Sequence, residues 1–181
     1  MYKFLSLACL TVLLSVSCIA QKQLDIGNHI PDFSLKDQDG NTFNMADSIA
    51  NGPFVIFFYP KDESLVCTKE ACGFRDSMNL FKQFGVQVVG INQGSVESHK
   101  SFQKDDNLNF ELLSDPDEKV IKAFGVKGGL FTKRVTYVVD ETGQIVFITT
   151  SSTDGKKHVA ETLLYIRQMR KHQKKQGSGG M

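Results

Sequence analysis

The feature that most constrains the fold is an uninterrupted apolar run, PFVIFFYP at residues 53–60, followed directly by a segment with helical periodicity. Aromatic and β-branched residues dominate the run, and no polar residues alternate with them. Strands covered on both faces have this character, whereas a strand with one solvated face alternates apolar and polar residues. The run therefore predicts a central strand covered on both faces.

Further elements follow from hydrophobic period, turn residues and helix caps. The expected elements are a hairpin at 32–45, a helix at 66–84, a strand at 86–91, a helix from Ser95 to about 106, a strand at 110–115, a helix opening at Asp115-Pro116-Asp117-Glu118, a hairpin at 134–150 and a last helix at 157–175. Strands and helices in this order predict one α/β domain whose helices cover both faces of a central sheet. We expect that domain to occupy residues 21–170.

Composition narrows the classes of function. The chain has 181 residues, of which 41% are hydrophobic and 23% are charged, enough apolar material for an ordinary packed core. Its formal net charge of +1 gives no reason to expect nucleic acid or an anionic membrane as a partner.

The first twenty residues predict export. Lys3 precedes the apolar run FLSLACLTVLLSV, which has the length of a signal-peptide core and is short for a membrane span. Small residues at Cys18 and Ala20 suit cleavage before Gln21, which makes 1–20 a signal peptide. Alternatively, LLSVSC is a weak bacterial lipobox that ends before Cys18, whose lipid would then tether the protein, or the segment stays as an uncleaved anchor. We expect a periplasmic or membrane-tethered protein.

The other end of the chain, residues 171–181, is basic and then rich in Gly and Ser. Cations are favourable at a helix C-terminus for electrostatic reasons alone. We expect a solvated helix end followed by a flexible tail.

Removal of residues 1–20 would take Cys9 and Cys18 and leave only Cys67 and Cys72. Two cysteines in an oxidising compartment usually form a structural disulfide. Their spacing argues against one here, because five helical residues separate Cα atoms by roughly 8–9 Å, whereas a disulfide needs less than about 7 Å. The pair suits a switch, helical when reduced and locally unwound when bonded.

Cys67 shares a helical stripe with apolar residues spaced at intervals of four and three, namely Ala71, Phe74, Met78 and Phe81. This stripe places Cys67 in the first helical turn, at the edge of the core. Free backbone N–H groups and the helix dipole favour a thiolate there, and the thiolate is the reactive form.

A proline and a hydroxyl residue precede Cys67 in the pattern P-x-x-x-S-x-x-C, formed by Pro60, Ser64 and Cys67. Ser64 can serve as the helix N-cap, and its hydroxyl can also face a small polar substrate. Attack of sulfur on an O–O bond leaves charge on the departing oxygen, which fixed donors stabilise. A zinc site is not indicated, because the chain has no second cysteine pair and His99 and His158 lack ligand-like spacing.

The segment YPKDESLVCTKEACGFRD resembles the active segment YPKDxTxxCTKEACxFRD of the peroxiredoxins, most closely the peroxiredoxin Q (bacterioferritin co-migratory protein) subgroup. The likeness continues through GINQGSVESHKSF, LLSDPDEKV and RVTYVVDETGQI and covers about residues 24–168. It implies a thioredoxin fold of the peroxiredoxin type, with a central mixed sheet flanked by helices and an N-terminal β-hairpin extension.

The resemblance also assigns roles. Cys67 matches the peroxidatic cysteine and Cys72 the resolving one, Pro60 matches the proline that shields the sulfur, Ser64 stands where Thr is usual, and Arg134 matches the arginine beside the thiolate and the peroxide. SLVC replaces the commoner TPGC, so bulkier side chains could narrow the entrance.

The implied reaction is reduction of a hydroperoxide through a sulfenic acid and an intramolecular disulfide, without metal, haem or flavin. We expect a thioredoxin-like reductant on the exported side and a monomeric protein. Two other interpretations remain open at this point: an exported thiol–disulfide oxidoreductase, against which the lack of CxxC counts, and a non-enzymatic domain with a structural Cys67–Cys72 bond.

Overall fold

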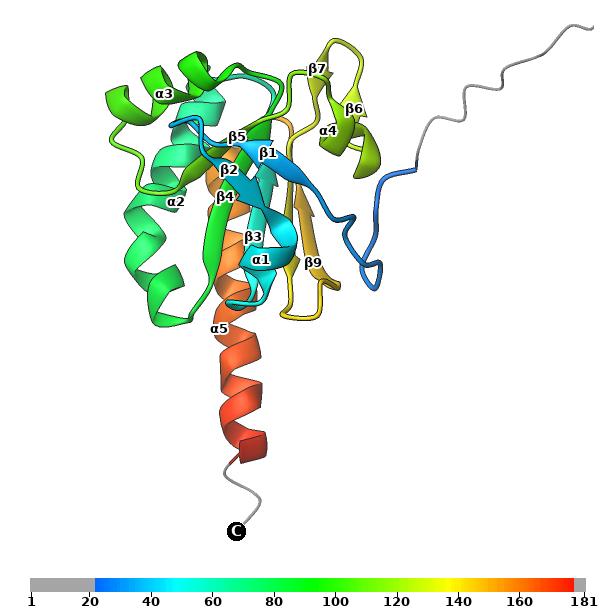
Figure 1. Ribbon diagram of the computed structural model, residues 1–181. Coiled ribbons are helices and arrows are strands. Elements are labelled where there is room, and N and C mark those ends of the chain that lie inside the picture. Colours follow the sequence, from blue (N-terminus) through cyan, green and yellow to red (C-terminus); the bar gives the residue numbers. More distant parts are fainter. Residues whose placement is uncertain (1–21, 178–181) are drawn as a thin grey trace, which may run out of the picture.

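The computed structural model describes residues 22–177 and consists of a mixed sheet with helices on both faces (Figure 1). The strands are β1 (Ser34–Lys36), β2 (Thr42–Asn44), β3 (Phe54–Phe58), β4 (Gln87–Asn92), β5 (Glu111–Ser114), β6 (Lys127–Gly128), β7 (Phe131–Thr132), β8 (Val135–Val139) and β9 (Ile145–Thr150). The helices are α1 (Met45–Ile49), α2 (Leu65–Gln83), α3 (Val96–Asp105), α4 (Lys119–Ala123) and α5 (Gly155–Gly177).

The main sheet has seven strands in the order β2-β1-β5-β4-β3-β8-β9. β3, β4 and β5 run parallel, whereas β8 pairs antiparallel with β3, with Phe58 opposite Val135. The carboxyl ends of the three parallel strands and the start of β8 therefore lie at one edge of the sheet. In parallel sheets, sites usually form at that edge.

β3 is the central strand that its sequence predicts, because all five of its residues are buried. Val55 and Phe57 face one apolar cluster, which includes α2, α5 and Phe102 of α3. Phe54, Ile56 and Phe58 alternate with them and face a second cluster, which includes α1 and α4. The α/β class, with helices on both faces and a β1–β2 hairpin before β3, is confirmed.

The helix expected from Asp115 begins later than its cap pattern predicts. The backbone N–H of Glu118 bonds to the carbonyl of Asp115, so a turn forms first, and Glu118 then takes a left-handed conformation with φ of 57° as the N-cap of α4. The Asp115 carboxylate still receives helix N–H groups, those of Lys119 at 2.9 Å and Ile121 at 2.8 Å. The prediction located the capping side chain but placed the helix start wrongly.

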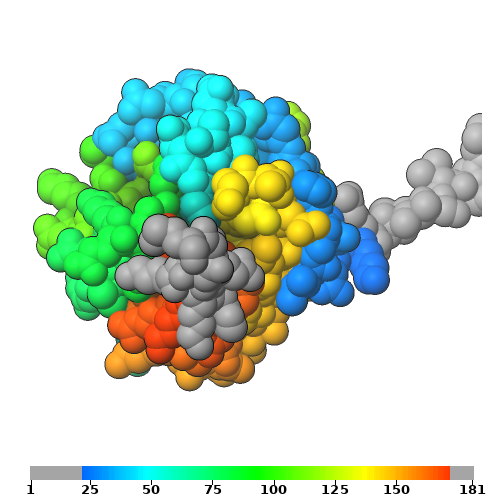
Figure 2. All heavy atoms as spheres, turned by 90° about the horizontal axis from the view of Figure 1, so that it is seen from below, coloured from blue at the N-terminus to red at the C-terminus, as the bar shows by residue number. Residues whose placement is uncertain are grey.

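α5 is longer than expected and continues to Gly177, so the first part of the basic segment is helical. The helix projects beyond the sheet at the edge opposite the carboxyl ends of β3, β4 and β5 (Figure 1). Seen from that end, α5 lies beside the end of α2 and the β8–β9 turn (Figure 2). Within residues 22–177, no helix is long and apolar enough to cross a membrane. The expected export segment, Cys9 and Cys18 included, and residues 178–181 lie outside the described residues.

Candidate active site

The candidate site forms where β3 ends, β8 begins and α2 starts. Pro60 follows β3 by two residues, and Arg134 directly precedes β8. Because Phe58 and Val135 are opposite each other in the sheet, the two segments meet at the same edge. The loop from Pro60 to Ser64 then leads into α2, whose first turn contains Cys67.

Cys67 is 1% exposed and lies against Arg134. Arg134 Nη2 is 3.1 Å from Cys67 Sγ, and the arginine side chain is itself buried. The sulfur therefore has two electropositive neighbours, this guanidinium and the N-terminus of α2. The structure thus brings together two residues that are 67 positions apart in the sequence.

Arg134 also pairs with a buried acid that the sequence analysis missed. Its Nη1 donates to Oε2 of Glu70, which is 0% exposed. The other carboxylate oxygen, Oε1, has no hydrogen-bond partner in the described part of the chain and lies 3.5 Å from His158 Nδ1. Thr136 Oγ1 is 2.8 Å from the same nitrogen. Cys67, Arg134, Glu70 and His158 therefore form one continuous buried polar cluster.

The charges in this cluster depend on burial. Burial raises the pKa of Glu70 to about 7, although Arg134 acts in the opposite direction. Burial lowers the pKa of His158 to about 4, and Arg134 adds to that effect. Near neutral pH, His158 is therefore neutral and Glu70 is close to its titration point.

The sequence did contain a sign of Glu70. It lies three residues after Cys67, so it shares the buried face of the helix, and a carboxylate on an otherwise apolar stripe needs a cation. His158 gave no such sign, because only the packing of α5 against α2 brings it near Glu70.

Ser64 is the N-cap residue of α2, but its side chain does not cap the helix. Its hydroxyl instead donates to the carbonyl oxygen of Lys61 at 3.3 Å. Of the two bulky residues that follow, Leu65 is 72% exposed and Val66 is half-buried. Both residues belong to the first turn of α2, where Leu65 lies at the surface and Val66 is partly covered.

Asp62 anchors the loop from Pro60 to Ser64, and the sequence analysis did not select this residue either. Its buried carboxylate accepts hydrogen bonds from Tyr59 Oη at 2.8 Å, Asn92 Nδ2 at 2.9 Å and Ser98 Oγ at 2.5 Å. His99 Nδ1 lies 2.8 Å from the same carboxylate. These bonds connect the loop before α2 to β4 and α3, which holds it in one conformation.

Cys72 lies further along α2 in a different environment. Its thiol is half-buried and donates to Asp106 Oδ1 at 3.7 Å. Arg75 Nη1 donates to the backbone carbonyl of Asp106 at 2.6 Å, which connects this part of α2 to the end of α3. Burial raises the pKa of the Cys72 thiol and Asp106 adds to the rise. Cys67 and Cys72 are both free thiols, and α2 is continuous between them.

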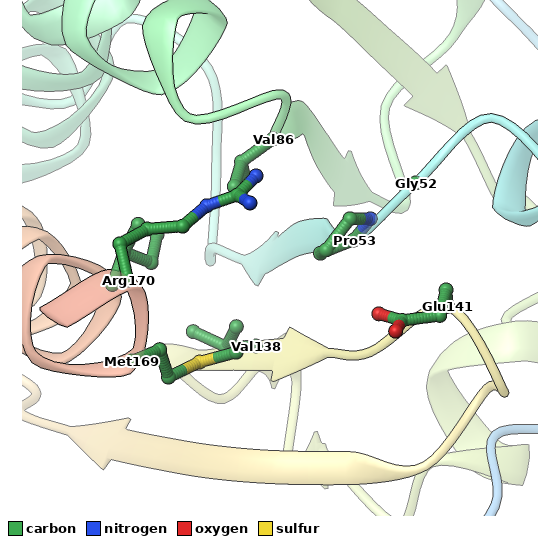
Figure 3. Close-up of a pocket in the computed structure, with 8 residues that line it drawn as sticks. Gly52, Pro53, Val86, Val138, Glu141, Met169 and Arg170 are labelled. Atoms are coloured by element: carbon green, nitrogen blue, oxygen red, sulfur yellow. The ribbon is translucent and has the colours of Figure 1, made fainter. Parts of the chain in front are cut away.

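A hollow at the other edge of the sheet contains none of the predicted site residues. Its walls come from the segment before β3, the end of β8 with the turn that follows it, the middle of α5, and the residue before β4 (Figure 3). Val86 and Val138 form apolar parts of the wall, and Arg170 donates to the carbonyl of Phe84 beside it. Within residues 22–177 there is also no group of three or more His, Cys, Asp or Glu residues that could hold a metal ion.

Comparison with known proteins is consistent with this geometry. The sequence profile of the AhpC/TSA family matches residues 26–148. The chain is 42% identical to a chloroplastic peroxiredoxin Q of Triticum aestivum over 146 residues, 79% of this chain and 67% of that protein. It is also 42% identical to the chloroplastic peroxiredoxin Q of Sedum lineare over 147 residues, 80% of this chain and 78% of that protein. The chain belongs to the AhpC/TSA family and, within it, to the peroxiredoxin Q subgroup.

Solved structures agree on fold and subgroup. Peroxidoxin BcpB of Mycobacterium tuberculosis superposes with a TM-score of 0.77 at 33% identity, covering 80% of this chain and 97% of that one. A cysteine-to-serine variant of Xylella fastidiosa PrxQ gives a TM-score of 0.76 at 26% identity, covering 83% and 99%. The thioredoxin fold of the peroxiredoxin type is therefore confirmed. As a peroxiredoxin, the chain is a thiol peroxidase that acts on hydroperoxides with a thiol reductant.

Proposed function

We propose that Cys67 is the peroxidatic cysteine of an atypical two-cysteine peroxiredoxin. The observation that carries this proposal is the 3.1 Å contact between Arg134 Nη2 and the buried Cys67 sulfur at the start of α2. The Cys67 thiolate attacks the terminal oxygen of a hydroperoxide. The S–O bond forms as the O–O bond breaks, the sulfur becomes a sulfenic acid, and the departing oxygen leaves as an alcohol or water after it gains a proton.

Arg134 and the free N–H groups of the first turn of α2 stabilise the negative charge that moves onto the departing oxygen. Pro60 shields the sulfur from solvent on the side of the loop. Ser64 supplies a hydroxyl at the helix start, and we expect it to leave the Lys61 carbonyl and bond to the bound peroxide.

Cys72 is the proposed resolving cysteine. Its thiol condenses with the Cys67 sulfenic acid, so that a disulfide forms and one water molecule leaves. The first turns of α2 must unwind for this step, since an intact helix keeps the two sulfurs too far apart. A thioredoxin-like dithiol then reduces the disulfide by exchange and returns both thiols. An intramolecular bond needs no second subunit, which is consistent with a monomer.

Hydrogen peroxide and organic hydroperoxides are the proposed substrates. The bacterioferritin co-migratory protein of Xanthomonas campestris, which is described as having alkyl peroxide reduction activity, superposes on this chain with a TM-score of 0.73 at 27% identity. No metal or organic cofactor has a step in this mechanism. The composition of residues 1–20 supports export, with release by cleavage before Gln21 or tethering through lipid on Cys18, and the reductant would then share that compartment.

Intact mass after one equivalent of hydrogen peroxide tests the mechanism. We expect the reduced protein to lose two hydrogen atoms within seconds, and peptide mapping to place the new disulfide between Cys67 and Cys72. The Cys67→Ser variant should show no change in mass and should leave the added peroxide unconsumed. A gain of one or two oxygen atoms on Cys67 would instead show a one-cysteine mechanism with an external thiol.

No change in mass would refute the assignment of Cys67. A thiol–disulfide oxidoreductase, the other candidate, would reduce insulin disulfides readily and would leave peroxide unchanged.

A further inference from the structure

Two acidic groups share one buried cation at the candidate site. Arg134 donates from Nη2 to Cys67 and from Nη1 to Glu70. Oxidation removes the charge of only one of them, because the thiolate becomes a neutral sulfenic acid. The charge that Arg134 faces must therefore change in the first step of the reaction, unless Glu70 responds.

We propose that Glu70 carries a proton while Cys67 is a thiolate and releases that proton when Cys67 is oxidised, so that Arg134 faces one full negative charge at each stage. The inference rests on the proposed role of Cys67. Because Glu70 acts through Arg134 and does not touch the sulfur, it is a positioning residue that also stores a proton.

The hydrogen bonds of His158 support the protonated form of Glu70. His158 Nε2 lies 3.2 Å from the carbonyl of Ser151, which can only accept, so a neutral His158 has its proton on Nε2 and a lone pair on Nδ1. Nδ1 also lies 2.8 Å from Thr136 Oγ1, whose hydroxyl can donate to that lone pair, so His158 offers no donor to Glu70 Oε1. Oε1 lies 3.5 Å from Nδ1 and has no hydrogen-bond partner in the described residues. An ionised oxygen buried here would face a lone pair and receive no hydrogen bond, which favours the protonated form.

The groups around Glu70 come from every element packed against it. Cys67 lies on α2 itself, Arg134 before β8, His158 on α5, and the Tyr59 phenol after β3, with a pKa well above its usual value through burial. Arg134 is the only cation among these four groups at neutral pH, since burial lowers the pKa of His158 to about 4. With Glu70 already titrating at about pH 7, a neighbouring thiolate favours its protonated form and loss of the thiolate favours its ionised form.

The proposed step balances without a proton from bulk solvent. The thiolate attacks the peroxide and gives a sulfenic acid and an alkoxide or hydroxide. That oxygen receives the proton of Glu70 through intervening water and leaves as an alcohol or water. The site begins with an anionic sulfur and a neutral carboxyl group and ends with a neutral sulfenic acid and a carboxylate.

Proton counting during a single oxidation tests the proposal. Cys72→Ser is used as the parent so that the reaction stops at the sulfenic acid, and its thiolate content is read first from ultraviolet absorbance. Hydrogen peroxide is then added in weak buffer with a pH indicator, in steps from about pH 6 to about pH 8. We expect Glu70→Gln in this parent to take up about one proton from solvent per thiolate oxidised, and the parent to take up about half a proton or less near pH 7.

The matched control is Glu97→Gln, which changes an exposed acid on α3 and should behave as the parent does. Equal proton uptake by the parent and Glu70→Gln would overturn the proposal. Should Glu70→Gln fail to fold, infrared difference spectra of the parent decide: oxidation should remove the band of a protonated carboxyl group, and an unchanged band refutes the proposal.

Failure of the proposed function gives a different result. In that case the intact mass shows no oxygen added to Cys67 and no proton count is obtained from any variant. If Cys67 is oxidised but Glu70→Gln changes nothing, only the role of Glu70 is lost.

Discussion

Cys67 and Cys72 lie about one and a half turns apart on α2, and their surroundings differ in burial and in the sign of the nearest charge. Cys67 is buried against a guanidinium, whereas Cys72 is half-buried and donates to a carboxylate. At Cys67 a cation contacts the sulfur. At Cys72, burial raises the pKa of the thiol and Asp106 adds to the rise, while Arg75 opposes it. The difference suits two successive steps, because the first needs a nucleophile at once and the second needs a thiol that stays out of reach until α2 unwinds.

The largest effect is expected when the cation that contacts Cys67 is removed. Arg134→Met should lower the second-order rate constant for hydrogen peroxide by a factor on the order of 10² to 10³, because a preorganised donor to the transition state is lost. Arg134→Lys should fall between this variant and wild type, since it keeps the charge but loses the planar fork. Stopped-flow oxidation of the reduced protein measures both.

The neighbouring Lys133 is exposed, so Lys133→Met provides a matched control that should retain the wild-type rate. A rate for Arg134→Met within about threefold of wild type would mean that the contact with sulfur has no part in catalysis.

The next effect concerns the pH dependence of stability, to which the buried groups near Cys67 should contribute and the carboxylate near Cys72 should not. Between about pH 4.5 and 6.5, folded Glu70 keeps a proton that the unfolded chain releases, so its contribution to stability falls as pH rises. Folded His158 lacks a proton that the unfolded chain binds, so its contribution rises with pH. The two slopes oppose each other in the wild type.

Glu70→Gln should remove the Glu70 slope, so that only the pH dependence due to His158 remains. Relative to wild type, the free energy of unfolding of this variant should rise by about 1 kcal/mol per pH unit across the interval. His158→Gln should show the opposite trend. Urea denaturation at several pH values measures both, and Asp106→Asn, on the Cys72 side, should follow the wild type. Parallel curves for all four proteins would show that neither buried group has a shifted pKa.

The smallest effect is expected at Cys72. Asp106→Asn removes one of the influences that raise the pKa of this thiol, after burial. More thiolate is then present at neutral pH, and disulfide formation after the sulfenic acid should speed up by up to about threefold. Single-turnover mass spectrometry or fluorescence gives the rate.

Asp105→Asn is the control, because Asp105 is exposed and adjacent in sequence. A slower disulfide step in Asp106→Asn alone would mean that the carboxylate assists the reaction as a base instead of holding back the thiol.

Long elements with a strong period could be predicted from the sequence. The apolar run before Pro60 predicted β3. The stripe of residues from Cys67 to Phe81 predicted α2, with each end of the helix correct to within one residue. Short elements gave no usable period: α1 has five residues, and β6 and β7 have two each. The late start of α4 reflects a turn at Asp115, after which Glu118 takes a left-handed conformation before the first helical residue.

For the site, the local pattern indicated Cys67, Pro60 and Ser64, while Arg134 came only from a family resemblance. A residue 67 positions away in sequence cannot be placed against a sulfur by period or spacing. Glu70 lay inside the analysed motif, but its burial becomes visible only when the sheet covers that face of α2. His158 depends on the packing of α5, which no local feature of the chain encodes.

The long projection of α5 gives the molecule two unlike poles (Figure 1). Cys67, the proposed peroxidatic cysteine, lies near the point where β3 ends, and the last turns of α5 leave the body at the opposite edge. A fluorescent reporter or a solid support attached beyond Gly177 would therefore leave the end of the molecule that contains Cys67 open to a large protein partner. The same geometry provides a fixed orientation for measuring, at a sensor surface, how fast a reductant docks and departs.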